Sequence, residues 1–123
     1  MKKIKLSKNI PHTWFIDLDG TILKHRGYLL NKSDSLLIGV KKFFSMIPKK
    51  DKIILTTSRK KKYLNKTKKF LRINKIRFHQ IICDLPYGER ILINDIKPKK
   101  KLKTSICINL KRDSGLSKYK ISR

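Results

Sequence analysis

Five short apolar runs, rich in isoleucine and aromatic residues, predict five β-strands. They cover residues 13–17, 52–58, 78–83, 91–95 and 105–109. The first run breaks abruptly into the polar segment Asp17-Leu18-Asp19-Gly20-Thr21, and the second runs into hydroxyl side chains. We therefore expect buried strands that end in chemically active residues.

Between these runs the pattern changes to helical spacing. Residues 36–47 carry an apolar stripe, with Ser33 as the expected cap and Pro48 as the stop. Residues 60–73 have a second stripe, and residues 22–30 resemble a hairpin-like flap. Residues 1–12 are a basic lead-in, and residues 111–123 are a polar tail.

Alternating strands and helices indicate an α/β fold with a mostly parallel sheet. The chain has 123 residues, which is the size of one domain, 1–123. Because the carboxyl ends of parallel strands meet at one edge, Asp17, Asp19, Thr57 and Asp95 are expected together there.

Two carboxylates close in sequence favour a cation site. Asp17 and Asp19 point to the same side of an ideal strand, roughly 6 to 7 Å apart. Thr57 and Ser58 lie where a strand ends and a helix is predicted to begin, so free backbone amides there favour a phosphate group. The bland alternative is that Asp17 to Gly20 is an ordinary polar turn.

The segment Asp17-Leu18-Asp19-Gly20-Thr21 resembles the DxDGT signature of the haloacid dehalogenase (HAD)-like phosphatases. The resemblance implies a three-layer Rossmann-like fold. It also implies that Asp17 is the nucleophile that accepts the phosphoryl group, while Asp19 is the acid/base that protonates the leaving oxygen and activates water. A phosphate monoester needs such a nucleophile, a proton donor and a cation to react at a useful rate.

The same resemblance assigns further residues. Thr57 would bind phosphate, with Ser58 beside it and Thr56 in reserve. Asp95 would join Asp17 and Asp19 in binding Mg²⁺, although the second acid usual near this position is missing.

The family's phosphate-binding lysine has no counterpart between residues 76 and 95. Arg90 is the expected replacement and Lys75 the fallback. Arg59 is equally well explained as a phosphate ligand or as a surface arginine. His25, Arg26 and Tyr28 of the flap have no certain role.

Short spacings between the motifs leave no room for a cap domain. Water exclusion and specificity must then come from the flap, from an oligomeric neighbour or from the bulk of the substrate. The motifs look most like those of small phosphatases of bacterial surface-polysaccharide biosynthesis. The resulting expectation is a magnesium-dependent phosphomonoester hydrolase that acts on a small, sugar-related phosphorylated metabolite.

The formal charge of +25 offers a different class of function, a nucleic-acid binder or a polynucleotide end phosphatase. However, the chain has no alanine and a single valine, Val40, a composition typical of A/T-rich coding DNA, and its lysines are dispersed. We therefore expect only nonspecific nucleic-acid binding at low salt.

The cysteines and the absence of targeting segments indicate the cellular location. Cys83 and Cys107 lie in apolar runs typical of reduced core cysteines. No signal segment or membrane span is evident in the sequence. The expected location is cytoplasmic.

Overall fold

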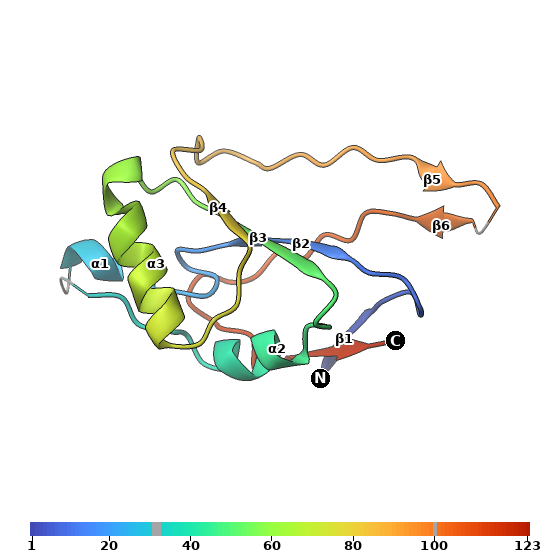
Figure 1. Cartoon of the computed structure of the whole chain (residues 1–123), viewed down its shortest axis with the longest axis horizontal. Coiled ribbons are helices and arrows are strands. Elements are labelled where there is room, and N and C mark those ends of the chain that lie inside the picture. Colours follow the sequence, from blue (N-terminus) through green and yellow to red (C-terminus); the bar gives the residue numbers. More distant parts are fainter. Residues whose placement is uncertain (31–32, 100) are drawn as a thin grey trace.

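A three-stranded parallel sheet lies at the centre of the molecule, with strand order β2-β3-β4. The computed structural model describes residues 1–30, 33–99 and 101–123 (Figure 1). The sheet strands are β2 (Thr13–Asp17), β3 (Lys52–Thr56) and β4 (Gln80–Ile82). Three of the five predicted strands are thus confirmed, together with the α/β class and the parallel arrangement.

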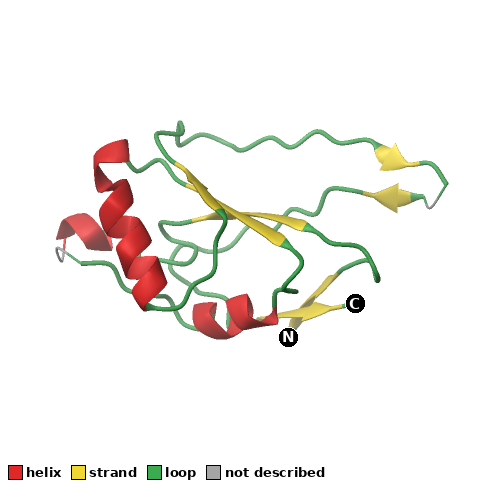
Figure 2. Ribbon diagram, in the orientation of Figure 1, coloured by secondary structure: helices red, strands yellow, loops and turns green. Residues whose placement is uncertain are grey.

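Short helices connect the sheet strands (Figure 2). They are α1 (Gly27–Leu30), α2 (Val40–Met46) and α3 (Leu64–Ile73), the last preceded by the 3₁₀ helix η1 (Lys61–Tyr63). The helix expected at 60–73 is confirmed, but residues 22–30 form turns and α1 instead of a hairpin. Within the described ranges, no helix combines the length and apolar character that a bilayer crossing requires.

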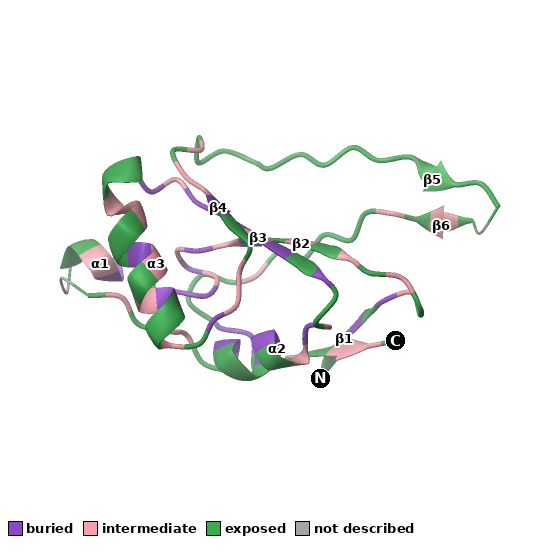
Figure 3. Cartoon of the chain, viewed as in Figure 1, coloured by how far each residue is buried: buried purple, intermediate pink, exposed green. Residues whose placement is uncertain are grey.

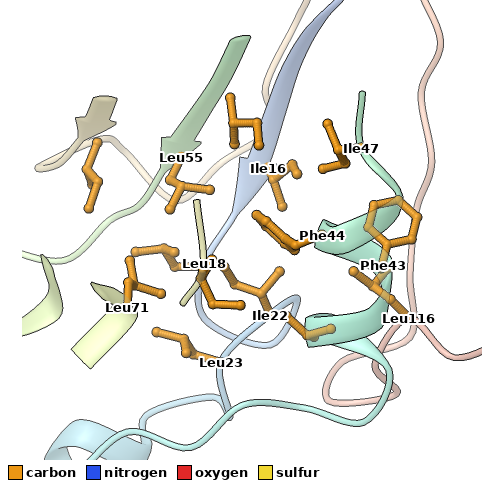
Figure 4. Packing of buried hydrophobic residues seen from close by; sticks show 14 of the residues in the cluster. Ile16, Leu18, Ile22, Leu23, Phe43, Phe44, Ile47, Leu55, Leu71 and Leu116 are labelled. Atoms are coloured by element: carbon orange, nitrogen blue, oxygen red, sulfur yellow. The ribbon is translucent and has the colours of Figure 1, made fainter. Parts of the chain in front are cut away.

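The hydrophobic core lies on one face of the sheet. Ile16, Leu55 and Ile81 are in register across the three strands, and all are buried. Figure 3 shows buried stretches on α2 and α3, and their buried side chains join the same cluster, as Figure 4 shows for Phe44 and Leu71. Each such side chain stabilises the fold by about 1.5–3 kcal/mol.

The opposite face of the sheet is open among the described residues. Phe15 on that face is 56% exposed, while Ile54 and Ile82 are half-buried. The described residues therefore form two layers, helices on a sheet, and the expected third layer is not seen. The physical reason is that the described residues after β4 form no helix, since the chain leaves the sheet in an extended conformation.

Helix α2 begins later than its apolar stripe predicts. Gly39 adopts a left-handed conformation (φ 78°) directly before Val40, so the helix cannot extend back to Ser33. The Leu37 N–H donates to the Ile22 carbonyl instead of continuing a helix. A Cβ atom at Gly39 would clash with the backbone of Ser117, so this close crossing of two loops also requires glycine.

The two ends of the chain form a second sheet, contrary to the expected lead-in and tail. Strand β1 (Lys2–Lys5) pairs in parallel with β7 (Tyr119–Ser122). Ile4 packs into the core from β1, and Leu116 does so just before β7. Apolar residues in alternate positions accompany this pairing, although lysines make up most of β1.

A buried carboxylate ties the N-terminal loop to the start of β3. Asp51 accepts hydrogen bonds from the His12 backbone N–H (2.9 Å) and from the Trp14 indole (2.8 Å), and it lies 3.0 Å from His12 Nδ1. Burial alone would raise the pKa of Asp51, but the hydrogen bonds from Trp14 and His12 together hold it below its ordinary value.

The predicted strands at 91–95 and 105–109 are wrong. Both segments are extended and belong to an exposed arm, defined here as residues 86–99 and 101–109, which projects from the sheet (Figure 1). Only β5 (Ile96–Lys97) and β6 (Leu102–Lys103) pair, antiparallel, near its tip. Ile91 is 82% and Ile93 88% exposed, because neither segment is paired with an edge of the central sheet.

Cys107 lies on this arm and is exposed, so it is not the core cysteine that its apolar surroundings predict. Cys83, at the end of β4, is half-buried. Both are free thiols.

Amide hydrogen exchange should separate the arm from the sheet. We expect the amides of residues 91–95 and 105–109 to exchange at nearly unprotected rates, since they lack ladder hydrogen bonds, whereas those of Ile54 and Leu55 should exchange slowly. Mass spectrometry of peptides after timed deuteration measures this. Slow exchange at 91–95 would mean that this segment pairs with a sheet edge in solution.

Candidate active site

Asp17 and Asp19 lie at the carboxyl end of β2, on a tightly anchored loop. Leu18, Ile22 and Leu23 are fully buried, and the Leu18 carbonyl accepts hydrogen bonds from the backbone N–H groups of Ile22 and Leu23 (both 3.0 Å). Gly20 has φ 84°, the left-handed conformation expected where the chain leaves the strand. Buried apolar side chains thus hold the two carboxylates at the protein surface.

The Asp17 carboxylate is oriented by a hydroxyl. Thr21 Oγ1 donates to Asp17 Oδ2 (3.1 Å), and Arg90 Nη2 lies 3.8 Å from Asp17 Oδ1. The side chains of Asp17 and Arg90 are 40% and 42% exposed, so Oδ1 faces an accessible, positively charged corner. Burial raises the pKa of Asp17, while the Thr21 hydrogen bond and the Arg90 charge oppose that rise.

Asp19 is held by a buried arginine. Arg59 Nε donates to Asp19 Oδ2 (3.0 Å), and Arg59 Nη2 donates to Asp19 Oδ1 (2.9 Å). This two-point contact fixes both carboxylate oxygens. The surface-arginine interpretation of Arg59 is wrong, since the residue is only 5% exposed.

A second carboxylate, that of Asp34, also binds the Arg59 guanidinium. Asp34 accepts from Nη2 (2.6 Å) and Nη1 (2.9 Å) of Arg59, and Thr67 Oγ1 accepts from Nη1 (2.9 Å). The Tyr28 ring covers the guanidinium at 4.0 Å. Burial alone would lower the pKa of Arg59, but Asp34 and Asp19 raise it above its ordinary value.

Thr57 lies beside Asp19, as predicted. Its Oγ1 accepts the Arg59 backbone N–H (3.0 Å) and donates to Asp19 Oδ2 (3.4 Å). Thr56 is paired with Asp17 across the sheet and is also buried, whereas Ser58 is half-buried. Hence Thr57 and Ser58 both lie at the carboxyl edge, and phosphate binding by them stays a prediction.

The expected amide cradle is less open than the pattern indicates. The segment begins with the 3₁₀ helix at Lys61, one residue after the expected start, and the Asp84 carboxylate accepts the Lys61 N–H (3.2 Å). The Asp84 N–H in turn donates to the Arg59 carbonyl (2.8 Å). The Lys61 N–H, a helix-start amide of the kind expected to face phosphate, is thus already bonded to Asp84.

Arg90 and Lys75 lie at different ends of the sheet. Arg90 is near Asp17, as given above, whereas Lys75 follows α3. The neighbouring Arg77 donates to the Asp51 carbonyl (3.2 Å), which places this end of α3 by the amino end of β3. Arg90 is therefore the cation that the fold places at the candidate site.

The expected magnesium ligands do not assemble in the structure. Asp95 directly precedes β5 near the tip of the arm, far from the end of β2 (Figure 1). In the described part of the chain, no three carboxylate, histidine or cysteine side chains gather into a metal-binding group. Of the three expected ligands, Asp19 is paired with Arg59, and Asp17 has an exposed oxygen at the site. One carboxylate, waters and substrate oxygens are a donor set that Mg²⁺ accepts.

The loop before β7 supports the site, a contact that the sequence pattern missed. The Asp113 N–H donates to the Gly20 carbonyl (2.9 Å), and Asp113 Oδ1 accepts the His25 N–H (2.8 Å). Asp34 was missed as well, since it follows no apolar run. The scarcity of acids, eight against 33 basic residues, was the available signal for both.

Replacing Arg90 with glutamine should raise the pKa of Asp17 further. The guanidinium favours the ionised carboxylate, so its removal favours the protonated form. Carboxyl-carbon NMR titration in metal-free buffer measures the pKa, and Lys75→Gln, which removes a remote charge, is the control. An equal pKa in both variants would show that Arg90 does not face Asp17 in solution.

Comparison of the chain with protein-family models, curated proteins and solved structures finds no significant match.

Proposed function

We propose that the chain is a HAD-like phosphomonoester hydrolase without a cap domain, which acts on a small phosphorylated metabolite through a phospho-aspartyl intermediate. The supporting observation is the pair Asp17 and Asp19 at the end of a parallel strand, one carboxylate accessible beside Arg90 and the other fixed by Arg59. This is a nucleophile next to a second carboxylate with a different environment, which is the arrangement that divided acid/base roles require.

In the first step, Asp17 Oδ1 attacks phosphorus and the bond from phosphorus to the leaving oxygen breaks. The Thr21 hydroxyl holds Oδ2, so that Oδ1 is directed outward. Arg90 stands beside Oδ1, where its charge offsets the negative charge of an arriving phosphate. For this step Asp19 first takes up a proton from solvent, which it then gives to the leaving oxygen.

In the second step, water attacks phosphorus and Asp19 accepts its proton. The acyl phosphate bond breaks, which releases inorganic phosphate and restores Asp17. Fixing Asp19 between Arg59 and Thr57 keeps the carboxylate in place through both steps. Mg²⁺ bound at Asp17 would supply further positive charge against the phosphate.

A small, sugar-related phosphate in the cytoplasm is the substrate class that the motif resemblance supports, as in surface-polysaccharide biosynthesis. The half-exposed Asp17 carboxylate is accessible to such a molecule. In this proposal specificity comes from the substrate's own bulk, from the α1 segment or from a neighbouring copy.

The alternative is a polynucleotide end phosphatase or a nucleic-acid binder. The observation in its favour is the net charge of +25, together with a cavity of about 370 Å³ lined by Lys68, Arg72 and Arg77. Arg77, however, already donates to the carbonyls of Asp51, Ile47 and Pro48. The cavity also lies at the end of α3 away from Asp17, so a phosphate group bound in it would not face the nucleophile.

Replacing Asp17 with asparagine should abolish hydrolysis of 4-nitrophenyl phosphate, by about a thousandfold or more, because the covalent nucleophile is lost. Activity of the unchanged protein should require added Mg²⁺ and disappear in excess chelator. Steady-state turnover measures both, and circular dichroism checks that the variant folds. Wild-type turnover by Asp17→Asn would eliminate the phospho-aspartyl mechanism.

The choice of substrate separates the two functions. We expect a higher kcat/KM for a sugar phosphate than for a 3′-phosphorylated oligonucleotide at moderate salt, since the basic residues are dispersed and do not interleave with aromatic side chains. A panel of sugar, nucleotide and oligonucleotide phosphates tests this. A clear oligonucleotide preference would favour the polynucleotide phosphatase.

A further inference from the structure

We propose that Arg59 and Asp34 are positioning residues that set the orientation of Asp19 during proton transfer, and that neither binds substrate. This inference rests on the proposed function and deepens it. In this proposal Asp34, which belongs to no motif, orients Arg59, and Arg59 is not a phosphate ligand.

The N–H donors of the Arg59 guanidinium are already occupied by protein groups. A guanidinium has five N–H donors. The Nε edge of Arg59 contacts Asp19, the Nη edge contacts Asp34, and Nη1 also donates to Thr67. These contacts use the donors on both edges of the fork, so a phosphate could bind Arg59 only by displacing a carboxylate.

One face of the guanidinium is also covered. Arg59 Cζ lies 4.0 Å from the centroid of the Tyr28 ring, and Tyr28 is itself in edge contact with Tyr63 (4.9 Å between centroids). The side chains of Arg59 and Asp34 are only 3% and 7% exposed. Asp19, at 21%, is the most exposed member of the group and is the one that opens toward the surface.

The charges of the group explain why Arg59 has two carboxylate partners, Asp34 and Asp19. Arg59 and Asp34 neutralise each other as a buried pair, and Asp19 then adds one negative charge at the accessible edge. Buried ion pairs add little net stability compared with apolar residues of similar size, so their value lies in geometry. The pair holds its position in the fold, and the hydrogen bond to Asp34 keeps Arg59 Nη2 placed so that it also donates to Asp19.

The expected consequence is specific to the leaving group. A nitrophenolate leaves without needing a proton, whereas an alkoxide needs one, and a positioned acid contributes on the order of 10²–10⁴-fold to such a step. If Asp34 positions Asp19, its loss should harm hydrolysis of alkyl phosphates far more than hydrolysis of 4-nitrophenyl phosphate.

The experiment compares kcat/KM for an alkyl phosphate and for 4-nitrophenyl phosphate in four proteins: wild type, Asp34→Asn, Arg59→Lys and Asp51→Asn. The ratio of the two values does not depend on the fraction of protein that is folded. Asp51→Asn is the matched control, because Asp51 is a buried acid at the opposite end of β3.

We expect the ratio of alkyl to aryl activity to fall about tenfold or more in Asp34→Asn and Arg59→Lys, through kcat and not KM, and to stay unchanged in Asp51→Asn. Should Asp34→Asn not fold, Asp34→Glu keeps the charge but shifts the guanidinium, and the same fall in the ratio is expected.

An unchanged ratio in the Asp34 and Arg59 variants of an active enzyme would overturn the positioning role and leave the proposed function intact. A rise in KM for both substrates in Arg59→Lys would instead show that Arg59 binds phosphate. If the wild type hydrolyses neither substrate, the proposed function itself fails, and with it the catalytic meaning of the Arg59 group.

Discussion

The carboxyl edge of this fold depends on one buried guanidinium shared by two carboxylates. Arg59 joins the loop after β2, through Asp19, to the segment before α2, through Asp34, and to α3, through Thr67. Loss of one partner would leave a buried charge unpaired, which typically costs about 3–5 kcal/mol. Three chain segments that are far apart in sequence therefore have to meet at one side chain for the site to form.

The scarcity of acids gives each one a definite position. Eight acidic residues face 33 basic ones, yet most of the acids contact particular donors instead of random lysines. Asp51 holds His12 and Trp14, Asp84 accepts the Lys61 N–H, and Asp113 accepts the His25 N–H. These bonds go to backbone N–H groups, to the Trp14 indole and to the His12 imidazole. The lysines of the described residues lie on the surface, whereas the acids connect loops to the two ends of the sheet.

The arm shows the limit of local patterns. Residues 91–95 have the composition of a buried strand, and their isoleucines are nevertheless exposed. A strand needs a neighbour that supplies backbone partners and a surface to cover, and neither requirement is written in the run itself. The same reasoning explains the open second face of the sheet, where Phe15 has no helix above it.

The sequence by itself determined the parallel strands β2, β3 and β4, the helix α3 and the presence of Asp17, Asp19 and Thr57 at one edge. The periodicity of side chains is a local property, and strands that alternate with helical connections favour parallel pairing, so these conclusions follow from the pattern. Only the tertiary structure decided that α2 begins at Val40, that the chain ends pair as β1 and β7, and that Asp95 lies on the arm. It also decided that Arg59 is buried against Asp34, a contact between residues 25 positions apart. Such contacts depend on which distant segments meet in space, because a hydrogen bond or an ion pair forms by proximity and leaves no periodic trace in the chain.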